Sequence, residues 1–416
     1  MKRNLGKLAG GALCMLLLSQ CGESTDNPPV NGGDPVFTPV FSSTGAEVRD
    51  FIAKGSGGAR AKLVYVDRTR ATATLNFLDF SEAAGAQPPI HVIALAKDAE
   101  VPVISPDGNW VVYATGNGAE AGSPTSARSS VYLVKLEENA QPVLVARDSA
   151  CEPRFVQDPP AGKLAVVYPT LCPNAAWEGF GRTLEVEVDV SGPDPVVGAP
   201  KVLRDDGSYT GGLSWDRKYL CGGGTHVAMV ELNGAKARPD TLSFHMVQSC
   251  NASISSSRNA TNTLMYLNFP KDSTPFVDGG KVWGEWQTIL ISNSKQQFVK
   301  GFTYPRTFAF DPETNPKSFT RAKWHHPEWS NHPYFAAATV NMNRYFQTDN
   351  GFANTDFQER LYLLNLKDST YLEVLRPETV KYTGKSLGGF YWPWLWVEVP
   401  AAFEEAPGWL ASPEQP

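Results

Sequence analysis

Three of the six histidines in this chain, His325, His326 and His332, lie close together in the stretch HHPEWSNHPYFAAATV. Imidazole nitrogens bind divalent metal ions and exchange protons near neutral pH. The cluster could therefore hold a metal ion or act in acid–base catalysis. The chain contains no H-E-x-x-H pattern, in which helical spacing would by itself indicate zinc. The segments that position these side chains decide whether they meet.

The first 20 residues have the pattern of an export signal. Lys2, Arg3 and Lys7 supply a positive start, and the apolar run Leu8–Leu18 has the length of a signal-peptide core. This run is too short to span a bilayer comfortably. Residues 1–20 are predicted to be a signal peptide, and the residues around Cys21 indicate the signal peptide of a lipoprotein.

The four residues LSQC, which end at Cys21, resemble the lipobox of bacterial lipoproteins. The resemblance implies that Cys21 carries acyl chains that hold the protein on a membrane. Gln20 stands where the pattern has a small residue, so an ordinary cleaved signal and an uncleaved anchor stay open. Gly22 is not acidic, which by the sorting pattern of Gram-negative lipoproteins favours the outer membrane of the cell envelope. Residues 21–35 are expected to form a lipidated, flexible linker, because they are rich in Pro, Gly, Asp and Asn.

Four cysteines lie beyond this region: Cys151, Cys172, Cys221 and Cys250. An exported protein meets an oxidising compartment in which disulfides persist. Proximity along the chain favours the pairs Cys151–Cys172 and Cys221–Cys250, and four buried free thiols are the alternative. No C-x-x-C motif occurs, so zinc-ribbon and thioredoxin-type sites have no support.

Charge and glycine patterns exclude several classes of function. The net charge of −6 gives no reason to expect nucleic acid, which is bound by basic patches. The glycine-rich stretch Gly116–Gly122 leads into Ser, Pro and Thr rather than into a helix, so it does not indicate a phosphate site. No G-x-S-x-G nucleophile elbow occurs. The sequence therefore implies no cofactor and favours a role other than catalysis.

Beyond residue 35 one pattern recurs: a tight turn, a short β-rich run, a gap and a second β-rich run. In the clearest copy, ISPDGNWVVYATG followed by SSVYLVKL, the turn is made by Pro106, Asp107 and Gly108. Equivalent turns are expected near residues 57, 105, 157, 214, 255 and 330. Repeats of roughly 40–50 residues with four strands each are the signature of a β-propeller. Loop insertions such as Pro270–Glu285 and Thr303–Lys323 account for the long last spacing.

The pattern predicts an all-β protein, a six-bladed β-propeller over residues 36–400, followed by a C-terminal tail at 401–416. Little amphipathic helical pattern is present in this region. The aromatic run GGFYWPWLWVEV, Gly388–Val399, is expected to pair with N-terminal strands such as PVFTPVF, Pro35–Phe41. Such pairing would close the ring and leave no long free sheet edge.

These repeats carry a family resemblance. The stretches SPDGNWVVYA, LSWDRKYL and WSNHPYFAAA resemble the turn-and-strand motif of TolB-type six-bladed propellers, over residues 36–400. The stretches CNASIS, HHPEWSNHPYFAAA, RLYLLNL and YWPWLWV also resemble a set of paralogous propeller lipoproteins of fibrobacters. TolB carries a separate α/β domain ahead of its propeller, for which this chain has no room. The envelope partners of TolB are therefore not carried over.

The repeat also places the histidines. Aligning EWSNHPYFAAATV with VISPDGNWVVYAT sets Ser330 on Ser105 and His332 on Asp107. In one interpretation, His332 therefore lies at a tight turn of the scaffold. His325 and His326 would then lie on the preceding strand, where adjacent side chains alternate faces and only one of the two can point into a given site.

In the other interpretation, His325 or His326 joins His332 and Glu328 at the central channel and binds a divalent metal. Some polysaccharide lyases on propeller folds use such histidine clusters. Two tryptophans beside the cluster could line a ligand site with it, because exposed aromatic rings stack on sugars and anchor protein partners. The candidate lining residues are His325, His326, His332, Trp324 and Trp329.

Two functional hypotheses follow. The first is a binding or scaffold module for an envelope protein or polysaccharide, attached to the membrane through its N-terminal lipid. The second is a metal-dependent polysaccharide lyase or hydrolase that uses His325, His326 and His332. Both share one architecture, and whether the imidazoles converge distinguishes them.

Overall fold

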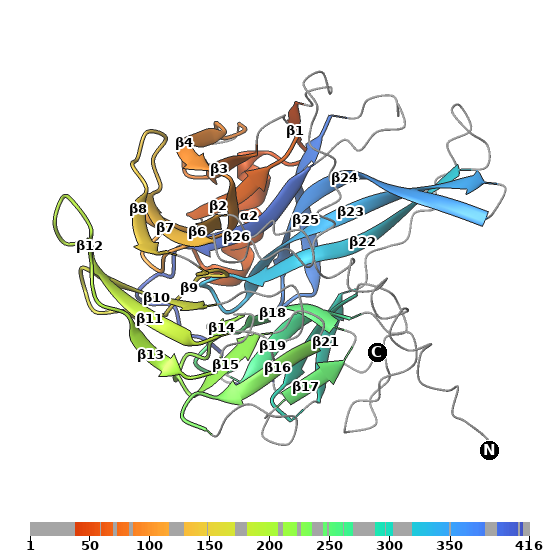
Figure 1. The fold of residues 1–416 in the computed structure, drawn as a ribbon. Coiled ribbons are helices and arrows are strands. Elements are labelled where there is room, and N and C mark those ends of the chain that lie inside the picture. The colour runs from red at the N-terminus through yellow and green to blue at the C-terminus, as the bar shows by residue number, and fades with distance from the viewer. Residues whose placement is uncertain are drawn as a thin grey trace, which may run out of the picture.

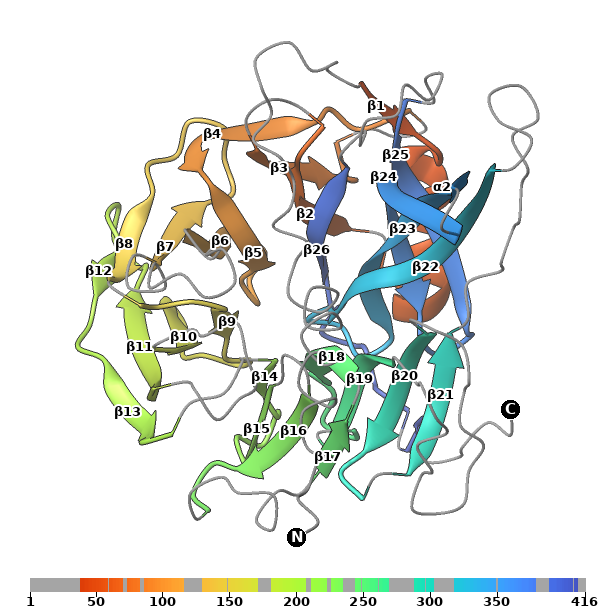
Figure 2. The ribbon, with the colours of Figure 1, turned by 45° about the vertical axis from the view of Figure 1, so that its right-hand side comes forward.

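The computed structural model describes residues 38–410 except 59, 70–72, 83–85, 116–128, 148, 171–180, 207–210, 223–225, 235–243, 248, 261, 269–287, 296, 303–317, 349–350, 379–388 and 407. In this part of the chain the strands form six antiparallel sheets. Figures 1 and 2 show the sheets arranged as a ring. The protein is therefore an all-β six-bladed β-propeller, as predicted. No described helix is long and apolar enough to cross a membrane.

The first three blades contain the strands with the following bounds. Blade 1 comprises β26 (Phe390–Val397), β2 (Ala61–Asp67), β3 (Thr74–Asp79) and β4 (His91–Lys97). Blade 2 comprises β5 (Ala99–Ile104), β6 (Trp110–Thr115), β7 (Ser130–Lys135) and β8 (Val143–Ala146). Blade 3 comprises β9 (Arg154–Phe155), β10 (Lys163–Pro169), β11 (Thr183–Asp189), β12 (Val196–Val197) and β13 (Lys201–Arg204).

The other three blades follow in chain order. Blade 4 comprises β14 (Gly212–Leu213), β15 (Tyr219–Gly222), β16 (His226–Glu231) and β17 (Phe244–Val247). Blade 5 comprises β18 (Ser249–Ile254), β19 (Thr263–Asn268), β20 (Thr288–Asn293) and β21 (Phe298–Phe302). Blade 6 comprises β22 (Ser318–Trp329), β23 (Phe335–Thr348), β24 (Gly351–Asn365), β25 (Thr370–Pro377) and β1 (Pro39–Phe41).

The ring is closed twice, by β26 and by β1. β26 pairs with β2, with Ala61 opposite Val397, and takes the first position in blade 1. β1 pairs instead with β25, with Pro39 opposite Pro377, as a fifth strand of blade 6. The C-terminal run therefore pairs with an N-terminal strand, as predicted, but that strand is β2 and not the example Pro35–Phe41. Burial explains the difference. Nearly every residue of β26 is buried, so this strand needs a partner strand on one side and neighbouring blades against both of its faces. β1 is only half-buried, which suits the outer edge of a blade.

A serine begins the turn between the first two strands in four blades. Ser105 donates its N–H to the Trp110 carbonyl at 2.9 Å and accepts the Trp110 N–H on its hydroxyl at 3.0 Å. Ser214 repeats the pattern in blade 4, and Ser255 and Ser330 begin the turns of blades 5 and 6. The predicted turns near 105, 157, 214, 255 and 330 all lie between the first and second strands of their blades.

The turn predicted near residue 57 is instead the end of a helix, α2 (Gly45–Ser56), that the sequence analysis missed. Thr44 and Glu47 form a capping box at its start, and Gly57 ends it with a φ of +69°. Its one apolar face, with Val48 and Ile52, packs on blades 1 and 6. The helix has only about three turns, and most of its side chains are small or charged. Its hydrophobic periodicity is therefore too weak to indicate a helix from the sequence.

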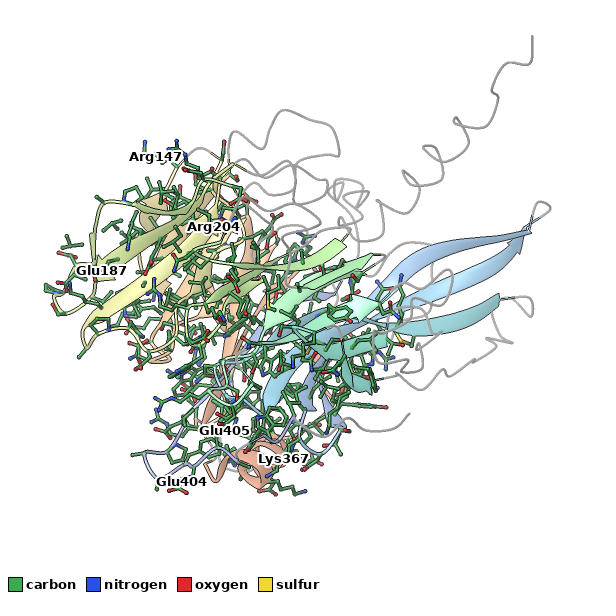
Figure 3. The ribbon with its side chains drawn as sticks, turned by 90° about the horizontal axis from the view of Figure 1, so that it is seen from below. Arg147, Glu187, Arg204, Lys367, Glu404 and Glu405 are labelled. Atoms are coloured by element: carbon green, nitrogen blue, oxygen red, sulfur yellow. The ribbon has the colours of Figure 1, made fainter. Side chains whose placement is uncertain are left out.

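Blades hold one another by apolar packing and by buried cations. The largest apolar cluster runs through blades 1, 2 and 3. Arg204 of β13 donates to the Leu232 carbonyl of blade 4 at 3.3 Å. Lys300 of β21 donates to the carbonyls of Leu366 and Lys367 of blade 6, both at 2.9 Å. Arg204 and Lys367 mark two of these contact regions in Figure 3. A charge buried between blades and bonded to backbone carbonyls fixes the angle at which the blades meet.

Blade 6 is the longest. β22, β23 and β24 extend well beyond the strands of the neighbouring blades (Figure 1). Part of the predicted loop insertion, residues 318–323, belongs to β22. The extra residues thus lengthen three strands of blade 6, and one of these, β22, carries two of the predicted histidines.

Candidate functional site

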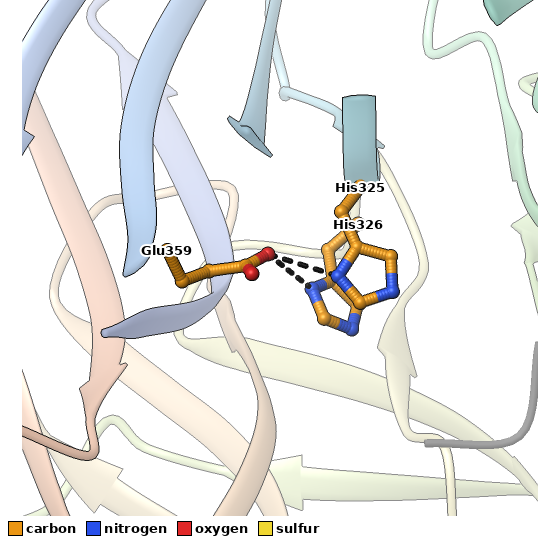
Figure 4. A group of neighbouring side chains, drawn as sticks. All are labelled: His325, His326 and Glu359. Carbon is orange, nitrogen blue, oxygen red and sulfur yellow. Dashed lines mark hydrogen bonds and ion pairs between the residues drawn. The ribbon is translucent and has the colours of Figure 1, made fainter. Parts of the chain in front are cut away.

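His325, His326 and Glu359 meet where blade 6 adjoins blade 1 (Figure 4). The two histidines lie near the end of β22, and Glu359 lies on β24 of the same blade. The ring nitrogens and carboxylate oxygen that could bind a metal ion all lie within 4.8 Å of one another. Glu359 also bridges to Gly389, which directly precedes β26. The strand that closes the ring therefore borders the site.

A β-bulge places both imidazoles on one side of β22. The register of β22 against β23 shifts between His325 and Glu328, and His326 has a φ of +43°. A bulge adds a residue to one strand and re-aims its side chains. The two ring centroids lie 3.7 Å apart. The expectation that only one of the adjacent pair could face a given site is therefore wrong, because the strand is irregular at this point.

Glu359 is buried, and three donors hold its carboxylate. His325 Nδ1 lies 2.9 Å from Oε1, Asn341 Nδ2 donates to Oε2 at 2.7 Å, and the Thr339 hydroxyl donates to Oε1. Thr339 and Asn341 are two residues apart on β23, so they point to the same face. The carboxylate therefore has a fixed orientation, as carboxylates that bind metals commonly have.

His326 is buried, and its Nδ1 reaches its neighbours only at long distances. It lies 3.4 Å from Thr339 Oγ1 and 3.8 Å from Glu359 Oε1. Burial lowers the pKa of His326 well below its usual value, and the nearby His325 and Arg68 lower it further. The ring is therefore uncharged at neutral pH, which leaves one nitrogen lone pair free to accept a proton or bind a metal ion.

An aromatic and cationic wall continues the site into blade 1. The His326 ring lies 5.4 Å from that of Trp392 and 5.7 Å from that of Tyr391. The Arg68 guanidinium lies 4.6 Å from the Trp392 ring and 5.0 Å from the Tyr391 ring. Arg68 also pairs with Glu100 of blade 2 at 3.4 Å. We call His325, His326, Glu359, Tyr391, Trp392 and Arg68 the junction site.

His332 lies outside this group, in the turn between β22 and β23. The Tyr334 N–H donates to its Nδ1 at 3.2 Å, and its ring centroid lies 5.1 Å from that of Phe335 and 4.7 Å from that of Phe403. Burial lowers the pKa of His332 to about 3. The prediction of a turn at His332 is confirmed. The prediction that it joins His325 or His326 in a site is corrected, because aromatic side chains enclose it within the scaffold.

Glu328 also has a structural partner. It forms an ion pair with Arg154 at 2.7 Å, and both side chains are buried. Arg154 belongs to blade 3 and Glu328 to blade 6, which stand opposite each other in a ring of six. The pair therefore spans the axis of the propeller. The hypothesis that Glu328 binds a metal ion with the histidines is replaced by this ion pair.

Trp324 and Trp329, predicted to line a ligand site, are packing residues. Trp324 is fully buried and meets the rings of Tyr362 and Tyr371 edge-on. Trp329 is buried and donates its Nε1 hydrogen to the Pro333 carbonyl at 3.0 Å. The two tryptophans are five residues apart, and the bulge between them turns both into the core cluster of blades 5 and 6.

The predicted Cys221–Cys250 disulfide does not form, and both residues are buried free thiols. Cys221 lies in the core between blades 4 and 5, whereas Cys250 faces the core between blades 5 and 6, so their side chains diverge. Cys151 is not among the free thiols, but Cys172 lies outside the described residues. Cys21, the signal peptide and the linker also lie outside them. The lipid anchor and the Cys151–Cys172 bond therefore stay predictions.

A second polar group lies in a groove of about 490 Å³ between blades 1 and 2. His91 Nε2 lies 2.7 Å from Glu82 and Nδ1 lies 2.7 Å from Glu138. Burial lowers the pKa of His91, but the hydrogen bonds and charges of the two carboxylates outweigh it and leave the pKa raised. Because both ring nitrogens are already bonded to carboxylates on opposite sides, this group is an ion-paired link between two blades.

Sequence reasoning did not identify Glu359 or Arg68. Glu359 lies 34 residues beyond His325, next to the apolar run RLYLLNL, and nothing in that spacing links the two. Arg68 directly follows β2, and only ring closure brings β26 and its aromatic residues beside it.

No protein-family model matches the chain, and no curated protein is detectably similar to it. Similar solved structures include a protein assigned to TolB from Agrobacterium tumefaciens, with a TM-score of 0.37 and 12% identity over 77% of this chain and 99% of that one. A protein of unknown function from Desulfotomaculum acetoxidans has a TM-score of 0.36 and 12% identity over 79% and 88% of the two chains. A periplasmic gluconolactonase from Pseudomonas aeruginosa has a TM-score of 0.33 and 11% identity over 82% and 99%. Likenesses of this strength carry no functional argument, and the class of the protein, a six-bladed propeller, stands on its sheet topology.

Proposed function

We propose that this protein is a binding module of the bacterial cell envelope, lipid-anchored through Cys21, whose propeller binds a polysaccharide at the junction site. One observation carries the proposal: Arg68 lies against Tyr391 and Trp392, beside the partly exposed imidazole of His325. Aromatic faces with a few fixed polar groups are the chemistry that recognises sugar rings. A protein ligand is the other outcome of the tests.

Rigidity supports the proposal. The Arg154–Glu328 pair spans the ring, and Arg204 and Lys300 fix the contacts between blades. A preformed site loses little conformational entropy when it binds. The junction site therefore needs no large rearrangement to accept a ligand.

Retardation of the purified protein in gels that contain polysaccharide tests the proposal, with one acidic and one neutral polysaccharide compared. Tyr391→Ala should weaken retardation about tenfold, which corresponds to about 1.4 kcal/mol, because the aromatic face that would stack on a sugar ring is lost. Tyr132→Ala is the matched control, since Tyr132 is a half-buried tyrosine of blade 2. Equal retardation of the two variants would show that polysaccharide does not bind at the junction site. No retardation of the wild type would contradict polysaccharide binding and favour a protein ligand.

The anchor has a separate test. In cells that make the protein, Cys21→Ser should move it from the membrane fraction to the soluble fraction, because stable attachment depends on acyl chains. Mass spectrometry of the N-terminal peptide should find those chains in the wild type. A variant that stays with the membrane would contradict lipid anchoring through Cys21.

A second candidate function is a metal-dependent polysaccharide lyase or hydrolase. The observation that favours it is the convergence of His325, His326 and Glu359, because two imidazoles and one carboxylate are a ligand set of catalytic zinc sites. Release of new chain ends from a polysaccharide, abolished by His326→Ala, would establish it. Binding without release would leave the binding module as the function.

A further inference from the structure

We propose that His325, His326 and Glu359 bind a divalent transition-metal ion, for which Zn²⁺ is the best-fitting probe. This inference goes beyond the proposed binding module. It shares its ligand set with the second candidate function, but it requires neither catalysis nor a polysaccharide. It replaces the histidine set expected from the sequence with one that includes Glu359.

The distances fit a single ion. In a tetrahedral zinc site with bonds of about 2.0–2.1 Å, ligand atoms lie about 3.3 Å apart. The two distances to Glu359 Oε1, 2.9 Å from His325 Nδ1 and 3.8 Å from His326 Nδ1, fall on either side of this value. The candidate ligand atoms of all three residues lie within 4.8 Å of one another, so rotation of the side chains could place them around one ion.

Hydrogen bonding holds His325 more closely than His326. The distance of 2.9 Å from His325 Nδ1 to Glu359 Oε1 is that of an ordinary hydrogen bond, whereas 3.8 Å from His326 Nδ1 is too long for one. His326 Nδ1 makes one long hydrogen bond, of 3.4 Å, with Thr339 Oγ1. A cation between the three groups would give this buried nitrogen a strong partner.

The surroundings have the features of a supported metal site. Thr339 and Asn341 fix the carboxylate, and such outer hydrogen bonds tune metal affinity. The His325 side chain keeps 18% of its surface exposed, which leaves an approach for the ion and an open coordination position. Among the four blades whose first strand has a described register shift, blades 1, 2, 5 and 6, only blade 6 carries imidazoles at both bulge positions.

The test is titration of the purified, chelator-treated protein with Zn²⁺ by calorimetry, with Co²⁺ absorption as a second readout of tetrahedral geometry. The wild type should bind one ion per chain, and its melting temperature should rise with Zn²⁺. Asn341→Ala should weaken binding about 10–100-fold, and His326→Ala and Glu359→Gln at least as much. Melting without metal confirms that each variant folds.

His91→Ala is the matched control, because His91 also lies between carboxylates and should not affect affinity. Absence of Zn²⁺ binding in the wild type would overturn the inference. Unchanged Zn²⁺ affinity in Glu359→Gln and His326→Ala would also overturn it. A loss of Zn²⁺ affinity in His91→Ala instead would place the ion between blades 1 and 2. Retardation of the metal-free protein in polysaccharide gels tests the proposed function separately. Retardation without Zn²⁺ binding would overturn the metal site alone and leave the binding module in place.

Discussion

Gly389 allows the closing segment of the chain to reach Glu359. A Cβ atom at position 389 would lie 2.2 Å from Glu359 Cβ and 2.6 Å from its backbone nitrogen. No side-chain rotation relieves contacts with backbone atoms, so the two segments would have to separate. At the residue scale, the site therefore depends on a position that has no side chain of its own.

Gly389→Ala should lower the free energy of unfolding by about 1–3 kcal/mol, the usual cost of forcing atoms into a packed region. It should also weaken any ligand or Zn²⁺ binding at the junction site. Gly192→Ala is the control, because its nearest neighbour would be 3.8 Å away. Urea unfolding measures the stability of both variants. Equal stability of Gly389→Ala and Gly192→Ala would contradict the close approach of Gly389 to Glu359.

His332 should make stability depend on pH. Its folded pKa of about 3 lies below the unfolded value of about 6.5, so between these values the unfolded chain binds a proton that the folded protein does not. Stability should therefore fall as pH decreases from about 6.5, with a slope that approaches 1.4 kcal/mol per unit. Burial also lowers the pKa of His326, so that residue should change stability in the same direction.

His332→Asn removes this titration and keeps a short polar side chain in the turn. Its free energy of unfolding should fall less steeply than that of the wild type between about pH 6.5 and 5, above the range in which most carboxylates titrate. Urea unfolding at several pH values measures the slope. Parallel slopes would mean that His332 is protonated in the folded protein.

At the scale of elements, one bulge recurs at the same place in the first strand of several blades. Register shifts occur between Glu100 and Val103, between Cys250 and Ser253, and between His325 and Glu328. Val101, Asn251 and His326 each have a positive φ. The bulge thus belongs to the scaffold, and the residues in it decide what each blade presents at the mouth of the ring.

The two closing strands should contribute unequally. A chain that ends at Leu387 lacks β26 and should lose cooperative unfolding, because blade 1 loses its first strand and the core of blades 1 to 3 loses three tryptophans. Deletion of residues 36–41 removes only the half-buried edge strand β1 and should lower the melting temperature while leaving one transition. Circular dichroism during heating measures both. A cooperative transition in the first variant would show that β26 does not close the ring.

At the scale of the whole molecule, the Arg154–Glu328 pair connects opposite blades across the axis. Burial raises the pKa of Glu328, and the charge of Arg154 and the Ser253 hydroxyl oppose that shift. The buried charge of Glu328 is therefore stabilised by the charge of Arg154, and that of Arg154 by Glu328. Removing one leaves the other buried without its partner.

Arg154→Met should lower the free energy of unfolding by about 3–5 kcal/mol. The double variant Arg154→Met with Glu328→Leu should recover most of that loss, because two apolar side chains of similar size need no compensating charge. Urea unfolding of the single and double variants gives the coupling energy. A double variant no more stable than the single one would indicate that the pair holds the blades together through more than mutual neutralisation.

The sequence by itself determined the repeated unit of the fold. Short β runs separated by turns with Ser, Asp and Gly predict hairpins, because those residues favour the backbone angles and local hydrogen bonds of turns. Ser105, Ser214 and Ser330 occupy the predicted turns. The placement of His332 at such a turn follows from the same local pattern.

Only the tertiary structure decided which residues meet at the junction site. His325 and His326 share a face because β22 bulges, and Glu359 reaches them from β24. Arg68 joins Tyr391 and Trp392 because β26 returns to pair with β2. Turn formation depends on a few neighbouring residues, whereas bulge position, strand order and ring closure depend on packing between segments far apart in the chain. For that reason the sequence predicted the blades but not the group of side chains between the last blade and the first.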